Sequence, residues 1–310
     1  MTVKTKQLPP GTELDNYIIS DTISAGGFSI VYMATDKRNG QLVVIKEYLP
    51  TRLAYRGEDL KVHPIDKTCI ASLNEGRKLF LLEVSALKKL THPNIVHITD
   101  SFGAYETVYI VMEFKPGKNL HAYVSDQNGG FSEKMLRTLF PPLLDGLRVV
   151  HENNLLHLDI KPGNVHVQPG GNPILLDFGA VIRKNMSRTM QPRPVITPGF
   201  SPVEQHDPKG YCGPWTDIYA IGATIRCCIE GQPPPVATAR KEKDTMKPAA
   251  VAFRKKYPAS MLEAIDWAME VDALLRPQTI DEFLEAFNKD MHTKKQEGGL
   301  KKFMKQLKLG

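Results

Sequence analysis

The sequence predicts an α+β fold in which a small β-rich lobe is followed by a larger, mostly helical lobe. Residues 17–48 alternate apolar and polar side chains between turn residues, a pattern typical of half-buried antiparallel strands. Beyond residue 117, apolar side chains recur at the three- and four-residue spacing of helices. Lys115-Pro116-Gly117 separates the two patterns and would form a short hinge. Two lobes joined in this way make a cleft, which is a usual place for a ligand.

The β-rich lobe is predicted to contain three strands, one helix and two further strands. Asn39-Gly40 is a strong hairpin signal between the second and third strands. A polar stretch at 50–70 shows no period and is predicted to be an irregular insertion. Apolar residues at helical spacing then predict a helix over 74–90. The predicted strands are 16–24, 29–36, 41–49, 94–102 and 107–114.

The larger lobe begins its helical pattern after the hinge. Ser260 and Thr279 stand at two predicted helix starts and are suitable N-caps. Short strands and loops interrupt the pattern at 157–205. The predicted helices are 132–154, 215–231, 259–271 and 279–290.

Composition fits an ordinary soluble globular protein, with 42% hydrophobic and 24% charged residues in a chain of 310. No run of about 18 apolar residues occurs, which argues against a transmembrane helix. The first 17 residues lack the apolar core and cleavage site of a signal peptide, so the expected location is the cytoplasm. The cysteines form no C-x-x-C motif and are expected to be buried reduced thiols, with a metal or redox role as the alternative: Cys69, Cys212, Cys227 and Cys228.

The net charge of +6 is concentrated at the C-terminal end of the chain. Residues 289–310 carry seven lysines against Asp290 and Glu297, a net of +5. No nucleic-acid binding is therefore expected of the main body. The tail would form a short basic amphipathic helix that suits an anionic membrane surface or an acidic partner, unless it packs on the main body or is a linker. Its apolar face would consist of Leu300, Phe303, Met304 and Leu307.

Residues suited to chemistry gather at 157–164, HLDIKPGN. Asp159 is a candidate base, and Lys161 would donate to a developing negative charge. Asn164 and, at the end of the next apolar strand, Asp177 offer the oxygen ligands that hard cations such as Mg²⁺ prefer. A D-x-K-x-x-N pattern alone occurs often by chance, so it indicates a catalytic loop only if other motifs of the same kind of site are present.

Two features nearer the N-terminus accompany it. Residues 23–32 place two glycines between strands, where small residues let backbone N–H groups approach phosphates, although a plain hairpin turn would look alike. Lys46 ends a buried strand, where an isolated charge would be costly. Glu83 on the following predicted helix is its expected partner.

Taken in order, these motifs resemble the protein kinase family, and specifically bacterial kinases of the eukaryotic Ser/Thr type. The resemblance implies a bilobal kinase-like fold with an N-lobe at 17–114 and a C-lobe at 115–288, between an N-terminal extension at 1–16 and the tail. The motifs are the glycine-rich loop at 23–32, VVIK at 43–46, HPNIV at 92–96, VMEF at 111–114, HLDIKPGN, DFG at 177–179, TPGFSPVEQ at 197–205, TDIYAIG at 216–222 and Arg276 in LLRP.

The resemblance implies a nucleotide site for ATP. Lys46 would hold the α- and β-phosphates and pair with Glu83, and Met112 looks like the gatekeeper. The backbone from Glu113 to Lys115 would hydrogen-bond the adenine. The implied ATP-binding residues are Ile23, Ser24, Ala25, Gly26, Gly27, Phe28, Ser29, Val31, Val44, Lys46, Met112, Glu113, Lys115 and His166.

The resemblance also implies phosphoryl transfer to Ser or Thr hydroxyls of protein substrates. Asp159 would accept or orient the hydroxyl proton, Lys161 would steady the γ-phosphate, and Asn164 and Asp177 would bind Mg²⁺, with Mn²⁺ as an alternative. Glu204 would pair with Arg276 to brace the lobe, and Thr197 would contact the base. The implied activation segment contains Asp177, Phe178, Gly179, Ser187, Thr189, Thr197 and Glu204, with Ser187 and Thr189 as candidate autophosphorylation sites or plain loop hydroxyls.

Four positions depart from the family pattern. Ser24 and Ser29 replace glycines of the phosphate loop, which is expected to weaken ATP binding without abolishing it. Leu158 replaces the arginine that often precedes the base, so activity is not expected to require a phosphate contact there. His166 stands where an apolar residue usually lies under the adenine.

Three further expectations stay open at the level of the sequence. The 50–70 insertion is either a regulatory or partner contact beside the helix of Glu83 or an inert extension. The alternatives to a protein kinase are a pseudokinase scaffold and a small-molecule phosphotransferase of similar fold. The oligomeric state does not follow from the sequence.

Overall fold

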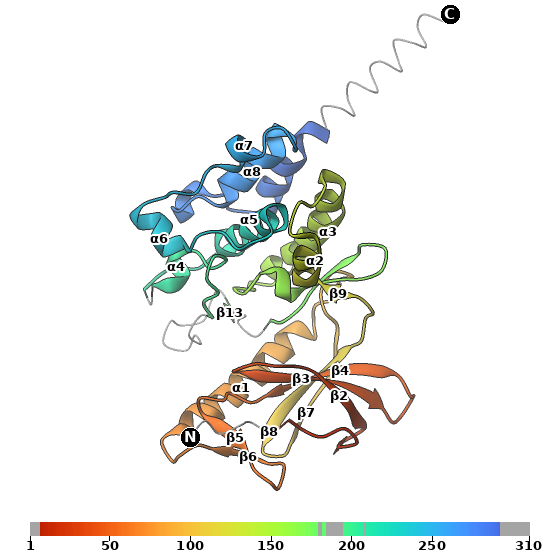
Figure 1. Ribbon diagram of the computed structural model, residues 1–310. Helices are drawn as coiled ribbons and strands as arrows, with labels where there is room; N and C mark the ends of the chain where they lie inside the picture. Colours follow the sequence, from red (N-terminus) through yellow and green to blue (C-terminus); the bar gives the residue numbers. More distant parts are fainter. Residues whose placement is uncertain (1–6, 179–181, 184–194, 208, 292–310) are drawn as a thin grey trace, which may run out of the picture. The chain divides into compact units, whose positions relative to one another are not determined.

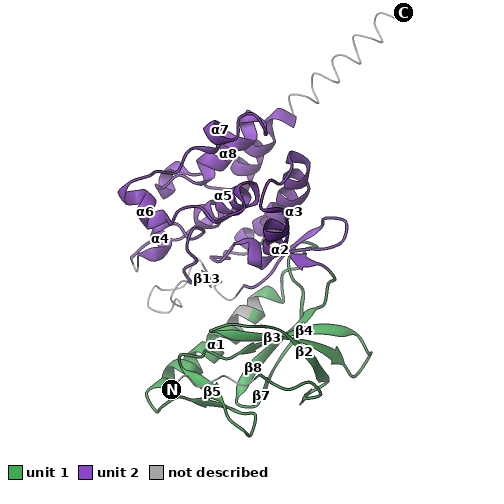
Figure 2. Ribbon diagram, viewed as in Figure 1, with its two compact units in different colours: residues 1–116 green, residues 117–310 purple. Residues whose placement is uncertain are grey.

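The computed structural model describes residues 7–178, 182–183, 195–207 and 209–291, apart from the side chains of 82–83, 85–86 and 182–183. The chain divides into two compact units, residues 1–116 and 117–310 (Figure 2). The first unit contains an antiparallel sheet and one long helix, and the second is mostly helical. The predicted α+β fold class is confirmed.

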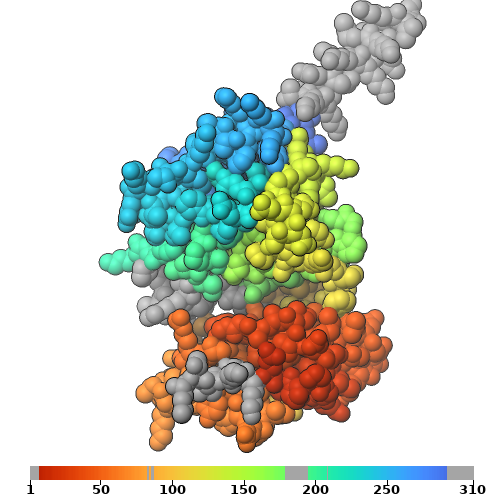
Figure 3. All heavy atoms as spheres, viewed as in Figure 1, coloured from red at the N-terminus to blue at the C-terminus, as the bar shows by residue number. Residues whose placement is uncertain are grey.

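Six strands form the main sheet of the first unit, in the order β1-β2-β3-β4-β8-β7 (Figure 1). Along β3, Ile30, Tyr32 and Ala34 are buried, and the residues between them are partly exposed. The alternation in the sequence therefore indicates a sheet with one buried face. α1 packs against β7 and β8. In the space-filling view, the residues of β1 to β4 appear in red on the face of this unit that is drawn (Figure 3). The elements are β1 (Glu13–Leu14), β2 (Tyr17–Ala25), β3 (Ser29–Asp36), β4 (Leu42–Tyr48), α1 (Cys69–Leu87), β7 (Ile98–Ala104) and β8 (Thr107–Glu113).

α1 begins at Cys69 rather than at residue 74. Asp66 explains the earlier start, because its Oδ1 atom accepts hydrogen bonds from the backbone N–H groups of Thr68 at 2.8 Å and Cys69 at 3.2 Å. A side-chain oxygen that satisfies the first free N–H groups of a helix fixes where the helix begins.

The 50–70 insertion contains strands that its sequence pattern does not predict. The segment contains an antiparallel hairpin of β5 (Ala54–Arg56) and β6 (Val62–Pro64). Arg56 points inward and forms an ion pair with Glu47 of β4, and both side chains are fully buried. Strands of three residues are too short to show a period, and a buried arginine looks like a surface residue in a sequence.

The second unit is built around α5 (Pro214–Glu230), which is buried along almost its whole length. α3 and α8 pack against α5. Among the described residues, no helix combines the length and the apolar character needed to cross a membrane. The remaining elements are β9 (Lys118–Asn119), α2 (Leu120–Gln127), α3 (Glu133–Glu152), β10 (Leu155–Leu156), the 3₁₀ turn η1 (Pro162–Asn164), β11 (Val165–Val167), β12 (Pro173–Leu175), β13 (Ile182–Arg183), α4 (Val203–His206), α6 (Ala237–Glu242), α7 (Ala249–Ala252), α8 (Ala259–Ala268), the 3₁₀ turn η3 (Ala273–Leu275) and a helix at 280–291.

Of the two predicted N-caps in this unit, one is confirmed and the other is wrong. Thr279 Oγ1 accepts a hydrogen bond from Glu282 N at 3.2 Å, as a cap does. α8 instead follows Pro258, and no side chain of the described residues caps it. Ser260 Oγ donates to Asp290 Oδ1 at 2.7 Å, which ties α8 to the last described helix.

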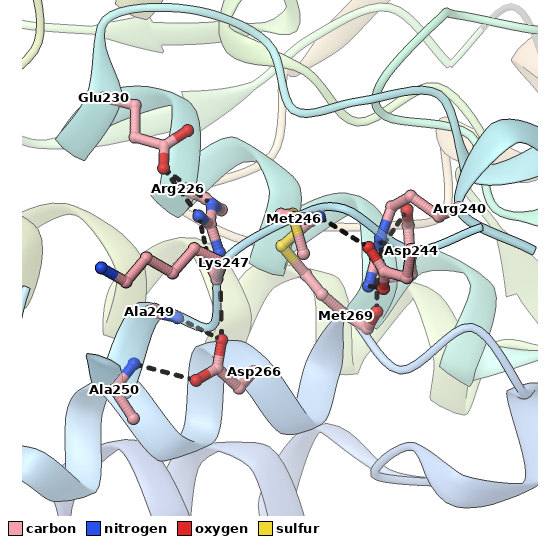
Figure 4. Close-up of polar contacts among 11 residues, drawn as sticks. Arg226, Glu230, Arg240, Asp244, Met246, Lys247, Ala249, Ala250, Asp266 and Met269 are labelled. Atoms are coloured by element: carbon pink, nitrogen blue, oxygen red, sulfur yellow. Dashed lines mark hydrogen bonds and ion pairs between the residues drawn. The ribbon is translucent and has the colours of Figure 1, made fainter. Parts of the chain in front are cut away.

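The irregular stretch between α6 and α7 is held in place by two side chains of the helical core (Figure 4). Arg226 of α5 is buried and donates to the backbone oxygen of Lys247 at 2.7 Å. Asp266 of α8 accepts from Ala249 N at 2.6 Å and from Ala250 N at 2.9 Å. Polar side chains of the core thus satisfy a carbonyl of the loop and the first two free N–H groups of α7.

Candidate active site

A buried carboxylate fixes the loop that leads into the 157–164 motif. Asp217 of α5 accepts hydrogen bonds from His157 N at 2.9 Å and from Leu158 N at 2.8 Å. His151 Nε2 of α3 lies 2.8 Å from the same carboxylate. Burial raises the pKa of Asp217, but the hydrogen bond from His151 and the neighbouring imidazoles outweigh it and hold the pKa below its ordinary value. Asp217 is therefore a charged anchor for the backbone that precedes Asp159.

The Asp159 carboxylate is the centre of a cluster of four predicted site residues. Lys161 Nζ donates to its oxygens at 2.7 and 2.9 Å, and Thr197 Oγ1 donates to Oδ1 at 2.7 Å. Asn164 Nδ2 donates to Oδ2 at 2.9 Å and to the backbone oxygen of Asp159 at 2.8 Å. These contacts fix the orientation of a carboxylate that is only 9% exposed. Such a group can accept a proton from a hydroxyl that approaches its remaining lone pairs.

The predicted donors for a metal ion, the Asn164 amide oxygen and the Asp177 carboxylate, fit Mg²⁺ in kind. Because the Asn164 amide nitrogen is used by Asp159, its amide oxygen is directed elsewhere, as a cation ligand requires. Leu176 N donates to Asn164 O at 2.8 Å, and His157 Nε2 lies 2.9 Å from Leu176 O, so the residue before Asp177 is fastened to the same loop. The described residues contain no group of three His, Cys, Asp or Glu side chains placed to bind a metal. Water and phosphate oxygens would complete the coordination of Mg²⁺ here.

Glu204 and Arg276, predicted as an ion pair, are brought together in the second unit. Arg276 donates to the Glu204 carboxylate through Nη1 at 2.7 Å and Nη2 at 3.1 Å, a bidentate geometry. Thr216 Oγ1 also donates to Glu204, at 3.0 Å. The Arg276 guanidinium lies 4.8 Å from the ring centroid of Tyr219. The pair therefore links α4, α5 and the turn at η3.

In the first unit, Lys46 lies in β4 with 6% of its surface exposed. Its Nζ atom is 5.7 Å from the ring centroid of Phe80 on α1. Glu83 lies on the same helix, but its side chain is outside the described part of the structure. The predicted Lys46–Glu83 pair therefore stays a prediction.

The glycine-rich loop is a tight connection between β2 and β3. Gly26 N donates to Ser29 O at 2.9 Å, and Gly27 O accepts from Thr51 N at 2.9 Å. Ser24 pairs with Val31 in the sheet, and neither serine is among the described residues with positive φ. The two serines that replace glycines thus occupy ordinary strand positions without backbone strain.

The other predicted nucleotide residues lie along the sheet and on one strand of the second unit. Val44 pairs with Met112 across β4 and β8. Glu113 accepts a hydrogen bond from Lys115 Nζ at 2.5 Å. His166 lies in β11, between Ile174 of β12 and Asn119 of β9. Beside the loop, Ala25 ends β2, Val31 pairs with Lys46, and Ile23 and Phe28 are half exposed.

Part of the predicted activation segment lies outside the described residues. This part includes Gly179, Ser187 and Thr189, and the same holds for tail residues 292–310. Phe178 is described and buried, with its ring centroid 4.6 Å from that of His157. The candidate phosphorylation sites and the tail helix stay predictions.

Two residues of the site were missed from the sequence. Asp217 anchors the loop before Asp159, and Gln205 donates to the backbone of Leu158 at 2.6 Å. A carboxylate inside the apolar run of α5 was a usable signal, because a buried charge needs partners. Gln205 carried no such signal, since a neutral amide near a helix start fits a solvated position equally well.

Comparison with known proteins agrees with this geometry. The sequence pattern described as "Protein kinase domain" matches residues 17–294. Mitogen-activated protein kinase kinase kinase 2 of Arabidopsis thaliana is 30% identical over 225 residues, which cover 68% of this chain and 31% of that protein. Cytokinesis protein sepH of Aspergillus niger is 28% identical over 222 residues, or 72% of this chain and 15% of that protein.

A solved structure, "PpkA-294 apo form", is also similar. It has a TM-score of 0.80 and 34% sequence identity, and the match covers 91% of this chain and 99% of that chain. The curated relatives are much longer than the stretch that they share with this chain. Because the family pattern spans most of the sequence and the fold agrees, the chain belongs to the protein kinase family.

Proposed function

We propose that this protein is an ATP-dependent kinase that transfers the γ-phosphate to Ser and Thr hydroxyls of protein substrates. One observation carries the proposal: the Asp159 carboxylate is held by direct hydrogen bonds from Lys161, Asn164 and Thr197. A kinase needs its base in one orientation, because phosphoryl transfer depends mainly on positioning and charge neutralisation. Membership of the kinase family supplies the reaction class.

In the proposed reaction, Asp159 orients the substrate hydroxyl and accepts its proton as the oxygen bonds to the γ-phosphorus. The bond between that phosphorus and the bridging oxygen breaks, and ADP is the leaving group. Lys161 lies beside Asp159 and would neutralise negative charge on the transferred group. Asn164 and Asp177 would hold Mg²⁺, which lowers the negative charge of the phosphates.

Specificity for Ser and Thr is supported by two features. Lys161 stands two residues after Asp159, which resembles the Ser/Thr branch of the family rather than the Tyr branch. One similar protein, ATG1c of Arabidopsis thaliana, is named as a serine/threonine-protein kinase and is 26% identical over 237 residues. Autophosphorylation at Ser187 or Thr189 belongs to the same proposal.

One assay tests the proposal. Purified full-length chain is given labelled ATP and Mg²⁺ with a generic protein substrate, beside an Asp159→Asn variant of nearly the same shape. We expect label in phosphoserine and phosphothreonine, and a rate about 100- to 10,000-fold lower in the variant. Removal of Mg²⁺ with a chelator should abolish transfer, and Mn²⁺ should restore part of it.

Three outcomes would contradict the proposal. Label on tyrosine would overturn the Ser/Thr assignment, and equal rates in the Asp159→Asn variant would overturn the role of Asp159. ATP binding without any transfer would identify a pseudokinase, the alternative that serines in the phosphate loop favour. Because Ser24 and Ser29 cause no backbone strain, the structure offers that alternative no support of its own.

A further inference from the structure

Gln205 of α4 makes two hydrogen bonds with a single amide group. Its Nε2 atom donates to the backbone oxygen of Leu158 at 2.6 Å and to the backbone oxygen of Val195 at 2.6 Å. The Gln205 residue is 3% exposed. The two N–H bonds of one buried amide therefore donate to two carbonyls, those of Leu158 and Val195, which are 37 residues apart in the sequence.

The Leu158 carbonyl belongs to the peptide bond that leads directly into Asp159. Leu158 has a φ of 61°, in the left-handed region that a leucine rarely adopts. Its N–H is held by Asp217, and its buried side chain packs beside Leu156 and Cys212. Gln205 holds the opposite end of the same residue, so an unfavourable backbone conformation is fixed from both sides.

We propose that Gln205 is a positioning residue that sets the orientation of Asp159 by tying the loop before it to residue 195 of the activation segment. This inference rests on the proposed kinase function and assigns a residue that holds the loop before its base in place. Where Leu158 stands, many kinases carry an arginine that meets a phosphate on that segment. Gln205 makes the connection with a neutral amide, so no phosphate is needed for the contact.

The chemistry of the amide defines the variants that test this role. Gln205→Met keeps the length of the side chain and removes both donors, which leaves the buried Leu158 carbonyl and the part-buried Val195 carbonyl without them. Gln205→Glu keeps the shape, but a carboxylate presents only acceptors to two carbonyl acceptors. When protonated, that glutamic acid regains one O–H donor.

The experiment measures kcat, the KM for ATP and the unfolding midpoint of the full chain, before and after phosphatase treatment. We expect kcat of Gln205→Met to fall about 10- to 100-fold, since small misplacements of catalytic groups cost that much, while the KM for ATP changes less than about threefold. The unphosphorylated wild type should keep its activity, and so should the Ser187→Ala/Thr189→Ala variant. A structural role alone would lower the unfolding midpoint without this split between kcat and KM.

A pH profile gives a second readout that does not depend on Gln205→Met being folded. The activity of Gln205→Glu relative to wild type should rise as pH falls from about 8 to 6, because protonation of the buried carboxyl restores a donor. The proposal is overturned by a flat ratio across that range, by wild-type kcat in a folded Gln205→Met variant, or by loss of wild-type activity after phosphatase. Wild-type transfer that depends on Asp159 is checked first in the same assay, so a failure of the kinase proposal is recognised separately.

Discussion

In the described part of the chain, each unit buries one carboxylate completely, and the two carboxylates have different partners. Glu47 in the first unit accepts hydrogen bonds from side chains: Tyr32 at 2.8 Å, Tyr109 at 2.5 Å and, as an ion pair, Arg56. Asp217 in the second unit accepts from the backbone of the loop before Asp159. Glu47 fastens a hairpin to a sheet, whereas Asp217 sets the path of the chain through the active site.

Because their partners differ, Glu47 is expected to contribute to stability alone and Asp217 to both stability and catalysis. Side-chain partners of Glu47 join two elements that are far from the predicted base in the sequence, so their loss is expected to lower the free energy of unfolding with little change in kcat. Backbone partners of Asp217 determine where Asp159 points, so their loss is expected to lower both quantities.

The largest effect on kcat is expected for Asp217→Asn. The new amide turns an N–H group toward backbone donors, so at least one buried hydrogen bond is lost and the loop before Asp159 shifts. We expect kcat to fall about 100-fold and the free energy of unfolding to fall by about 3 kcal/mol. Steady-state kinetics and urea unfolding measure the two; unchanged kcat in a folded variant would remove the proposed link between Asp217 and catalysis.

The next effect concerns the buried pair of the first unit. Arg56→Met leaves Glu47 as an uncompensated buried charge, and the free energy of unfolding should fall by about 3 to 5 kcal/mol. The Glu47→Gln/Arg56→Met double variant should recover a large part of that loss, because it removes the unpaired charge. Both variants are expected to keep kcat within about threefold of wild type at a temperature where they are folded, since no catalytic group moves. A 100-fold loss of kcat would show that the hairpin is part of the catalytic apparatus.

The sequence predicts the elements around the two carboxylates, but it does not predict the partners of the carboxylates, and the reason is physical. The five strands around Glu47 and the helices around Asp217 follow from periodicity, because a half-buried element repeats its apolar residues. The residues that pair with a buried charge occur at no regular spacing, so periodicity does not reveal them. In the sequence Arg56 therefore looks like a surface residue of an irregular insertion, and α2 was missed because only Leu120 and Val124 of that short helix are buried.

The sequence identifies the predicted catalytic residues more readily than the residues that hold them in place. Asp159, Lys161, Asn164 and Thr197 follow from motifs, since their spacing is fixed by the reaction. The residues that hold them in place, Asp217 and Gln205, lie within the motifs at 216–222 and 197–205. Their side chains bind backbone groups of the loop before Asp159, which any residue type can supply, so the spacing of the motifs does not reveal this role. Motifs therefore identify the groups that carry out chemistry, and the structure is needed to find the groups that orient them.

A smaller effect is expected at the glycine-rich loop, the part of the first unit that is predicted to touch ATP. Thr51 is exposed and donates from Oγ1 to Gly27 O at 3.1 Å, beside the backbone bond between the same residues. Thr51→Val removes the hydroxyl and keeps the shape, so the loop should be less ordered before ATP binds. We expect the KM for ATP to rise about two- to fivefold with kcat unchanged. Thr51→Ser, which keeps the hydroxyl, is the matched control, and an equal rise in both variants would contradict the role of the hydrogen bond.

The smallest effect expected is the pH dependence of the Asp217 contribution between pH 8 and pH 5. Burial raises the pKa of Asp217, but the hydrogen bond from His151 and the neighbouring imidazoles lower it below the ordinary value of 3.8. A carboxyl whose pKa is depressed by folding stabilises the folded state fully above its unfolded pKa, and this stabilisation is lost only as pH falls through the folded value. With His151→Gln in both chains, which removes that imidazole, the difference in unfolding free energy between His151→Gln and His151→Gln/Asp217→Asn should therefore stay constant from pH 8 to pH 5. If the difference shrinks above pH 5 in that background, the Asp217 carboxylate is protonated too easily to be the charged anchor of the active site.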